Sequence, residues 1–332
     1  MTLRANMSAL LRKLRIGQAW YFLYHRPKSV LQQSMSEGGP LEQWRTAQGR
    51  DAMIEAARVM PELARELVCR APVTVHFLTG TRFWYQAVFC IWTFAKCSGR
   101  PVHGVILDDG TLQGNQFEAI SRVCTSATLI ANREIEERLD QHLPATKFPS
   151  LRGRRLTLPL MRKILDVHAG QKGWRLSLDS DLLFFRRPTM LLDWLADPSC
   201  PIRAIDVQNA YGYPLEIMSG LAGHPVPERV NTGILGLKSD AIDWERMESW
   251  CRGLIEARGP HYFQEQALVA MLLAGREHFV APLADYVTLP RPPEARACRA
   301  VMHHYVAESK RWYFQSNWRR VLEPGNSSEP SP

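Results

Sequence analysis

The chain has 332 residues, 45% of them hydrophobic and 22% charged, a balance typical of folded globular proteins and not of disordered ones. Its formal charge of +8 favours an anionic partner such as a nucleotide phosphate, a nucleic acid or an acidic membrane surface. The seven cysteines are scattered without paired C-x-x-C spacing, which argues against a disulfide framework or a zinc site and favours reduced thiols in a cytoplasmic protein.

Residues 1–70 form a basic extension that we expect to be helical. Arginines and lysines alternate there with leucines and aromatic residues, as in a basic amphipathic helix. Such a helix could lie on an anionic membrane surface or pack on the following domain. We expect neither a signal peptide nor a membrane span, because no apolar run is long enough. The expected location is therefore the cytoplasm, with peripheral attachment to the inner membrane surface as an open alternative.

Residues 71–323 are expected to form one catalytic domain, because strand and helix patterns alternate from residue 72 onward. The first predicted strands are 73–78, 102–107 and 127–130, and the first predicted helices are 83–95, 117–124 and 134–142. This order predicts an α/β fold with an open, mostly parallel sheet and helices on both faces.

The second half of the domain continues the same alternation. We predict helices at 158–168, 190–196, 244–255 and 263–274, and strands at 174–178, before Asp206 and at 230–237. The stretch 208–227 is rich in glycine and proline and long for a plain connection, so we expect a binding loop or lid. Residues 324–332 are expected to be a disordered tail.

Asp179 and Asp181 follow an alternating apolar segment and should stand at the end of a buried strand. Two neighbouring carboxylates in an apolar setting are unfavourable unless a positive charge compensates them, and a hard divalent cation would do so. A solvated turn is the alternative. Thr79 and Asp108 also fall at strand ends, where ligands of parallel sheets bind, so all four side chains are expected to meet in one crevice.

Four separated motifs occur between residues 73 and 312. They are Leu178-Asp179-Ser180-Asp181, Val230-Asn231-Thr232-Gly233, Glu265-Gln266, and His304 with Lys310 and Trp312. With Arg162 upstream, they make the chain resemble the GT-A nucleotide-sugar glycosyltransferases, most closely family 8, which includes glycogenin and bacterial lipopolysaccharide galactosyl- and glucosyltransferases. Glu265, Ala307 and Arg311 replace the Asp, Gly and Pro of the family motifs, which indicates a divergent branch.

The resemblance implies a GT-A fold and a metal-dependent hexosyltransferase. Its donor would be a nucleotide-diphosphate sugar, expected to be a UDP-sugar, and its cofactor Mn²⁺ or Mg²⁺ held by Asp179, Asp181 and His304. His303 stays open as the alternative ligand, because neighbours in a strand point in opposite directions. Lys310 would add a positive charge beside the diphosphate.

The other site residues follow from the resemblance, for Arg162, Asn231, Glu265 and Gln266, and from their places at strand ends, for Thr79, Asp108 and Asp206. Thr79, Asp108, Arg162, Asp206 and Asn231 are expected to contact the nucleotide sugar. Turn or capping roles are the alternatives for the two aspartates, and a solvated helix surface for Arg162. Glu265 and Gln266 are expected near the anomeric carbon. The family implies retention of anomeric configuration, while an inverting reaction with Glu265 as the base stays open.

Two other functions compete with this interpretation. A sugar-phosphate nucleotidyltransferase would share the fold and metal carboxylates, but it normally has a glycine-rich phosphate loop, and the first strand is followed here by a single glycine, Gly80. A non-catalytic protein that binds a membrane surface through its basic N-terminus is the other alternative. The expected acceptor is a saccharide, a lipid-linked molecule or a protein. No nucleic-acid-binding motif occurs, so nucleic acid is not expected as a partner.

Overall fold

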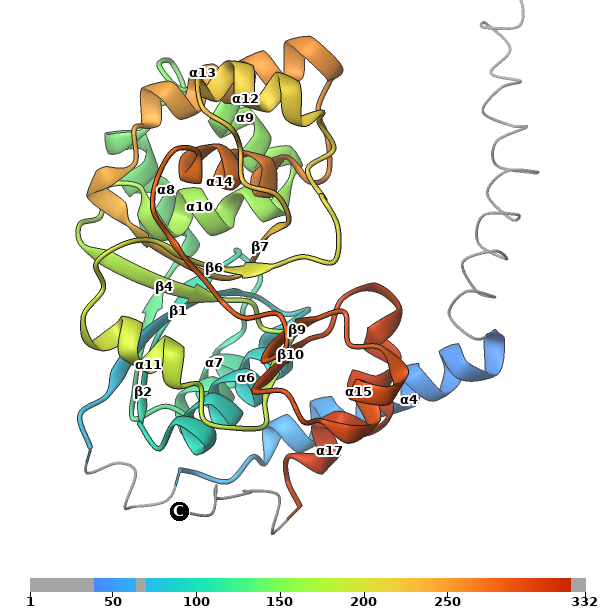
Figure 1. Cartoon of the computed structure of the whole chain (residues 1–332). Helices are drawn as coiled ribbons and strands as arrows, with labels where there is room; N and C mark the ends of the chain where they lie inside the picture. Colours follow the sequence, from blue (N-terminus) through green and yellow to red (C-terminus); the bar gives the residue numbers. More distant parts are fainter. Residues whose placement is uncertain (1–38, 64–69, 324–332) are drawn as a thin grey trace, which may run out of the picture.

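The computed structural model describes residues 39–63 and 70–323, so the predicted N-terminal helix and the predicted tail lie outside it. A seven-stranded sheet in the order β3-β2-β1-β4-β7-β6-β8 forms the centre (Figure 1). All its strands are parallel except β7, which is antiparallel to both neighbours. The strands are β1 (Val73–Thr79), β2 (Val102–Asp108), β3 (Ser126–Ile130), β4 (Trp174–Leu178), β6 (Ile202–Ile205), β7 (Val230–Lys238) and β8 (Phe279–Val280).

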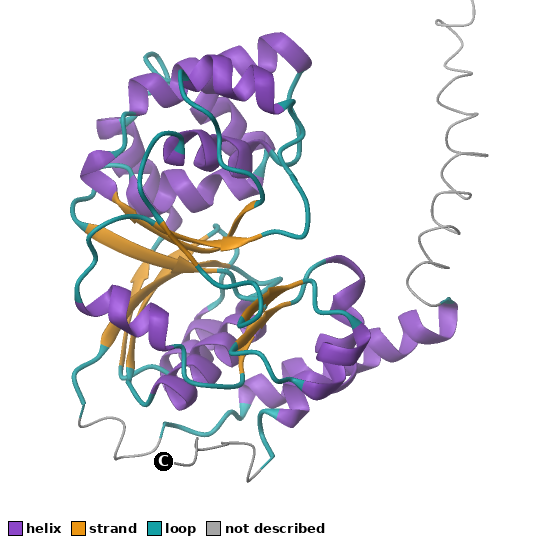
Figure 2. Ribbon diagram, in the orientation of Figure 1, coloured by secondary structure: helices purple, strands orange, loops and turns teal. Residues whose placement is uncertain are grey.

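Helices cover both faces of this sheet (Figure 2), as the sequence predicted. One face carries α8 (Asn132–His142), α9 (Pro149–Thr157), α10 (Arg162–His168), α12 (Leu215–Ala222), α13 (Trp244–Arg258) and α14 (Gln264–Leu273). The other carries α6 (Trp84–Ser98), α7 (Gly114–Arg122) and α11 (Thr189–Ala196). Each layer has its own apolar core against the sheet. The predicted fold class, an open and mostly parallel sheet between helices, is confirmed.

A second, three-stranded sheet brings two distant parts of the chain together. It consists of β5 (Leu182–Phe184), β10 (Met302–His304) and β9 (Tyr286–Thr288), in that order. Strands β5 and β10 are antiparallel, and His304 pairs with Leu182. Since Leu182 directly follows Asp181, this register places His304 next to the acidic motif at the end of β4.

The chain before residue 70 contributes to the same packed body. Helix α4 (Pro40–Arg58) places Met53 and Ala57 in the core that also holds α6 and the C-terminal segment. That segment runs through α15 (Pro292–Ala297), η4 (Ala307–Ser309), α16 (Lys310–Trp312), the π-helical turn η5 (Tyr313–Asn317) and α17 (Trp318–Arg320). The predicted division at residue 70 stays a prediction for the part that lies outside the described residues.

The expected lid at 208–227 is wrong in one respect, because it contains α12. Pro214 precedes this helix, and Gly223 ends it with φ 75°, a left-handed conformation that glycine adopts without strain. Met218 and Ala222 are buried against the layer of α13 and α14. Glycine and proline here mark the ends of a helix and not a structureless loop. The helix expected at 158–168 is also divided, into the 3₁₀ turn η2 (Pro159–Met161) and α10.

Within residues 39–63 and 70–323, no helix has the length and hydrophobicity that crossing a bilayer requires. The cysteines of these ranges are all free thiols, as the sequence predicted. They are Cys90, Cys97, Cys124, Cys200, Cys251 and Cys298.

Candidate active site

The loop that carries the two aspartates is held on both sides by backbone hydrogen bonds. The Asp179 amide donates to the Gly233 carbonyl in β7 at 2.9 Å, and the Tyr305 amide donates to the Asp181 carbonyl at 3.0 Å. The first bond continues the pairing of β4 with β7, and the second continues the pairing of β5 with β10. The acidic loop is therefore fixed between the two sheets.

Asp179, Asp181 and His304 bring one ligand atom each to within 4.8 Å of one another. His304 Nε2 lies 3.3 Å from Asp181 Oδ1 and 3.6 Å from Asp179 Oδ2. Ligands of an ion bound at about 2.1 Å lie about 3 to 4 Å apart, so these separations fit a shared divalent cation. The three predicted metal ligands thus lie together, as a metal site requires.

The orientation of His304 follows from its second ring nitrogen. Nδ1 lies 3.2 Å from Asn231 Oδ1, and an amide oxygen can only accept a hydrogen bond, so Nδ1 carries the proton. Nε2 is then the ring nitrogen directed at the two aspartates, and it would offer its lone pair to a cation bound between them. His303 points elsewhere: its Nε2 lies 2.9 Å from Glu294 Oε1, and its Nδ1 lies 3.0 Å from Tyr305 Oη. Of the two histidines, His304 is the one beside the aspartates.

Asn231 belongs to a network that reaches α14. Its Nδ2 donates to Asp206 Oδ2 at 3.0 Å, and Gln266 Nε2 donates to the same oxygen at 3.2 Å and to the Ala210 carbonyl at 3.0 Å. The other oxygen of Asp206 accepts from the Val207 amide. Asp206 therefore holds Asn231 and Gln266 in place, and its predicted contact with the donor stays a prediction.

Lys163 is the central residue that the sequence did not single out. The side chain of this α10 residue is only 10% exposed, and its ammonium group lies 2.8 Å from Asp179 Oδ1 and 3.0 Å from Thr232 Oγ1. Burial would lower the pKa of Lys163, but Asp179 and Glu265 outweigh it and raise the pKa. The helix also contains Arg162, Asp166 and His168, so the sequence did not distinguish this lysine, and only the fold brings it to Thr232 and Asp179.

Glu265 is a buried carboxyl close to this lysine. It is 2% exposed, and its Oε2 accepts a hydrogen bond from Thr232 Oγ1 at 3.1 Å. Its Oε1 has no hydrogen-bond partner in the described part of the chain. Burial, with Asp179 adding to it, raises the pKa of Glu265 to about 7, although Lys163 acts in the opposite direction. Glu265 can therefore exchange a proton near neutral pH.

On the other side of the aspartates, Lys310 Nζ lies 3.3 Å from Asp181 Oδ2. Burial would raise the pKa of Asp181, but His304 and Lys310 lower it well below its usual range. Asp181 is therefore a carboxylate at neutral pH and can act as a ligand. The two lysines flank the acidic pair, one on each aspartate.

A cavity of about 340 Å³ opens beside these groups. Its walls include Thr79, Asp109, Arg162, Lys163, Asp179, Asp181 and Lys310, together with Phe83, Gln86 and Tyr262. Thr79 Oγ1 and Gln86 Oε1 are buried and have no hydrogen-bond partner within the described ranges. Buried polar atoms of this kind are rare unless a ligand or water completes them. Two residues of the cavity wall next to the acidic motif therefore carry buried polar atoms without a hydrogen-bond partner in the described chain.

Asp108, the last residue of β2, and Asp109 after it have different surroundings. Asp108 Oδ1 accepts from the amides of Gly110, Thr111 and Leu112 and so stabilises its own turn, while Asp109 lines the cavity. Arg162 also lines the cavity and donates to the Asp109 carbonyl at 2.8 Å and to Asn132 Oδ1 at 3.2 Å. The predicted contact of Asp108 with the donor stays a prediction, and Asp109 is the neighbour that faces the space.

No family model matches the sequence, and no curated protein does. Among solved structures, apo WbbM, a bifunctional glycosyltransferase, is 12% identical with a TM-score of 0.49, over 79% of this chain and 52% of its own. Galactosyltransferase LgtC in complex with donor and acceptor sugar analogues is 12% identical with a TM-score of 0.48, over 78% of this chain and 97% of its own. Mouse xyloside xylosyltransferase 1, apo form, is 12% identical with a TM-score of 0.43, over 70% of this chain and 98% of its own.

The present chain thus spans about half the length of WbbM. All three proteins are glycosyltransferases, the class that the sequence motifs resemble. At these identities and TM-scores the likeness assigns no substrate, metal or residue role. The functional assignment therefore rests on the arrangement of side chains around Asp179 and Asp181.

Proposed function

We propose that this protein is a metal-dependent glycosyltransferase that moves a hexose from a nucleotide-diphosphate sugar, most simply a UDP-sugar, to a saccharide, lipid-linked or protein acceptor. One observation carries the proposal: Asp179, Asp181 and His304 converge from two distant parts of the chain beside a cavity whose wall residues include buried polar atoms without a hydrogen-bond partner in the described chain. A cytoplasmic location and contact of the basic N-terminus with an anionic membrane surface belong to the same proposal.

The donor set favours Mn²⁺ over Mg²⁺ or Ca²⁺. Two carboxylates suit all three ions, whereas an imidazole ligand suits transition metals better than the oxygen-seeking Mg²⁺ and Ca²⁺. The hydrogen bond from His304 Nδ1 to Asn231 fixes the ring in the orientation that a ligand needs. When bound, the ion would act as a Lewis acid that neutralises the departing nucleotide diphosphate.

The chain supplies further charge and positioning for the same leaving group. Lys310, beside Asp181 and 36% exposed in its side chain, can extend towards a phosphate at the mouth of the site. Arg162 is braced by Asp109 and Asn132 at the wall of the cavity and can donate to a phosphate or a sugar hydroxyl. Preorganised cations of this kind stabilise charge that develops as the bond to the leaving oxygen breaks.

Glu265 and Gln266 are proposed to face the sugar. Both hydrogen bonds of Gln266 use its amide nitrogen, which leaves the amide oxygen to stabilise positive charge at the anomeric carbon. One carboxyl oxygen of Glu265 has no hydrogen-bond partner in the described chain. Because the pKa of Glu265 is about 7, its carboxyl group can either accept a hydrogen bond from a sugar hydroxyl or donate one to it. Retention of configuration by attack from the leaving-group side is the proposed outcome, and NMR of the first product distinguishes it from inversion.

Calorimetry with UDP, with and without Mn²⁺, tests the proposal. We expect UDP to bind only when Mn²⁺ is present, and Asp181→Ala to abolish that binding. Glu256→Ala, which removes an exposed carboxylate on α13, is the matched control and should bind as the unaltered chain does. Absent binding, or binding that ignores the metal, would overturn the proposal. A mass-spectrometric screen of nucleotide sugars then identifies the hexose.

A further inference from the structure

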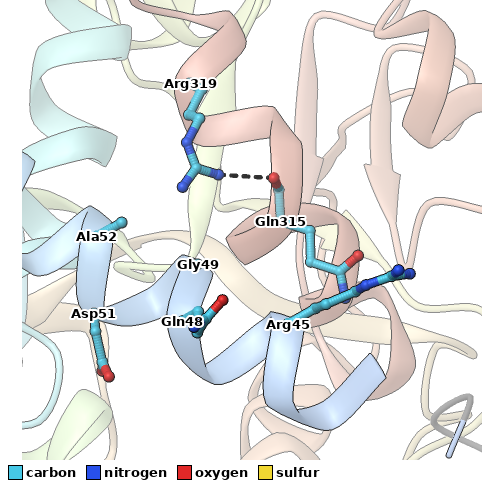
Figure 3. Close-up of a pocket in the computed structure, with 7 residues that line it drawn as sticks. All are labelled: Arg45, Gln48, Gly49, Asp51, Ala52, Gln315 and Arg319. Carbon is cyan, nitrogen blue, oxygen red and sulfur yellow. Dashed lines mark hydrogen bonds between the residues drawn. The ribbon is translucent and has the colours of Figure 1, made fainter. Parts of the chain in front are cut away.

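The segment that carries His304 and Lys310 does not end at the active site. It continues through α16 into the π-helical turn η5, whose outer side lies against α4 (Figure 3). Gly49 in α4 is at the point of closest approach, because an added Cβ would overlap the carbonyl oxygen of Phe314 and lie 2.7 Å from its carbonyl carbon. These are backbone atoms and cannot swing aside. Any side chain at position 49 would therefore push α4 and η5 apart.

Gln315 joins the same two elements by hydrogen bonds. Its Nε2 lies 2.9 Å from Thr46 Oγ1, 3.1 Å from Glu42 Oε2 and 3.2 Å from the Glu42 carbonyl. A cavity of about 610 Å³ lies beside this contact and is lined by Gly49 and its neighbours in α4, by Gln315 of η5 and by Arg319 of α17 (Figure 3). The cavity therefore borders the contact between α4 and η5 without separating them at Gly49 or Gln315.

From η5 the contact leads directly to the acidic motif. The ring of Tyr313 stacks on that of Tyr305, with centroids 4.8 Å apart, and the Tyr305 amide donates to the Asp181 carbonyl at 3.0 Å. Asn317, at the other end of η5, donates to Tyr305 Oη at 2.7 Å. Tyr305 also directly follows His304. A displacement of η5 would thus be felt by a metal ligand and by Lys310.

We infer that α4, which precedes the predicted catalytic domain, is a positioning element of the active site: its contacts with Phe314 and Gln315 set the position of His304 and Lys310. The inference rests on the proposed function for its readout. The π-helical turn between the two is consistent with it, because such turns occur frequently at functional sites. Gly49 and Gln315 touch no substrate in this scheme and act only through the segment that they hold.

The test uses Gly49→Ala and Gln315→Ala in the full chain. Binding of UDP with Mn²⁺ and the KM and kcat of donor turnover are measured well below the melting temperature of each variant. We expect the Kd and KM for the donor to rise about tenfold, as for other residues that orient metal ligands. Gln315→Lys, which can still donate to Glu42, should restore most of the affinity. Gln315→Ala removes only a half-buried side chain and keeps the test valid if Gly49→Ala fails to fold.

Gly220→Ala on α12 is the matched control, because an added Cβ there meets nothing within 4 Å. It should leave donor binding unchanged. If Gly49→Ala and Gln315→Ala lower the melting temperature but bind UDP with Mn²⁺ as the unaltered chain does, α4 is only a structural support and the inference is wrong. If the unaltered chain itself binds no UDP, the proposed function fails first, and the inference falls with it.

Discussion

His304 Nε2 lies 3.3 Å from Asp181 Oδ1, although His304 is in β10 and Asp181 is in the turn before β5, more than a hundred residues earlier in the chain. The pairing of β10 with β5 creates this proximity, and the hydrogen bond to Asn231 fixes the tautomer that exposes Nε2. The proposed metal site therefore depends on the tertiary fold. Its ligand geometry can therefore be altered by residues that touch no metal.

His304→Ala should lower the affinity for Mn²⁺ by more than the about 10- to 100-fold that the loss of an outer-shell partner costs, because it removes one of the three proposed protein ligands. His303→Asn is the control. His303 is fully buried against Glu294 and Tyr305, so this variant should lower the melting temperature but leave the Mn²⁺ affinity unchanged. Calorimetric titration with Mn²⁺ measures the affinity of both variants. The opposite pattern, with metal binding lost only on changing His303, would reject the assignment of His304.

Lys163→Met should destabilise the protein by about 2 kcal/mol without metal, because Asp179 loses its close cation while remaining partly buried. Mn²⁺ would replace the missing charge. The rise in melting temperature on adding Mn²⁺ should therefore be larger for Lys163→Met than for the unaltered chain, while donor turnover falls. Lys172→Met, at an exposed position, should behave like the unaltered chain. Equal metal-induced shifts in all three proteins would show that Lys163 does not balance the acidic pair.

Much of the fold could be predicted because its signals are local. Alternating apolar residues mark β4, and the nearly continuous apolar run of α6 marks a helix buried on all sides. The acidic pair stands at the end of such a strand, so its place at the ligand-binding edge followed from a general rule for parallel sheets. His304 was then predicted as the third ligand from its spacing to Lys310 and from the resemblance of the motifs.

The rest depended on tertiary contacts that the sequence does not encode locally. In the sequence Lys163 looks like any helical lysine. Its role emerges only when α10 packs on the sheet, because Thr232 of β7 and Asp179 after β4 then contact its ammonium group. Asp108 and Asp109 are adjacent, and the course of the turn decides where each side chain points. The sequence alone therefore could not show that Asp108 bonds within the turn while Asp109 lines the cavity. The contact of Gly49 with Phe314 joins the two ends of the described chain.

Gly233→Ala should weaken Mn²⁺ binding by about tenfold while the protein stays folded. An added Cβ would lie 2.5 Å from Cε1 and 2.6 Å from Nδ1 of His304, so the ring must move away from Asn231 and the aspartates. Gly236→Ala on the same strand is the control, since its Cβ would instead meet Trp194 and Ile202 in the core. Both variants should lose stability, but only the change at Gly233 should alter Mn²⁺ affinity. A similar loss of affinity in both would point to a general loosening of β7.

Glu265 should make the stability of the metal-free protein fall between about pH 4.5 and pH 7. Its pKa is raised by burial to about 7 in the folded state from its ordinary value of 4.5, so in this window the folded protein holds a proton that the unfolded chain has released. The stabilisation by the neutral carboxyl is complete below pH 4.5 and is lost as the pH rises to 7. The shift corresponds to about 3 kcal/mol.

Glu265→Gln, which cannot ionise, removes this component. Urea unfolding at pH 4.5 and pH 7.5 in the presence of a chelator measures it, because the difference in unfolding free energy between the unaltered chain and the variant should change by about 3 kcal/mol between the two pH values. Glu256→Gln, at an exposed position, should show no such change. If Glu265→Gln and the unaltered chain lose stability in parallel over this range, Glu265 is ionised throughout and cannot exchange a proton near neutral pH.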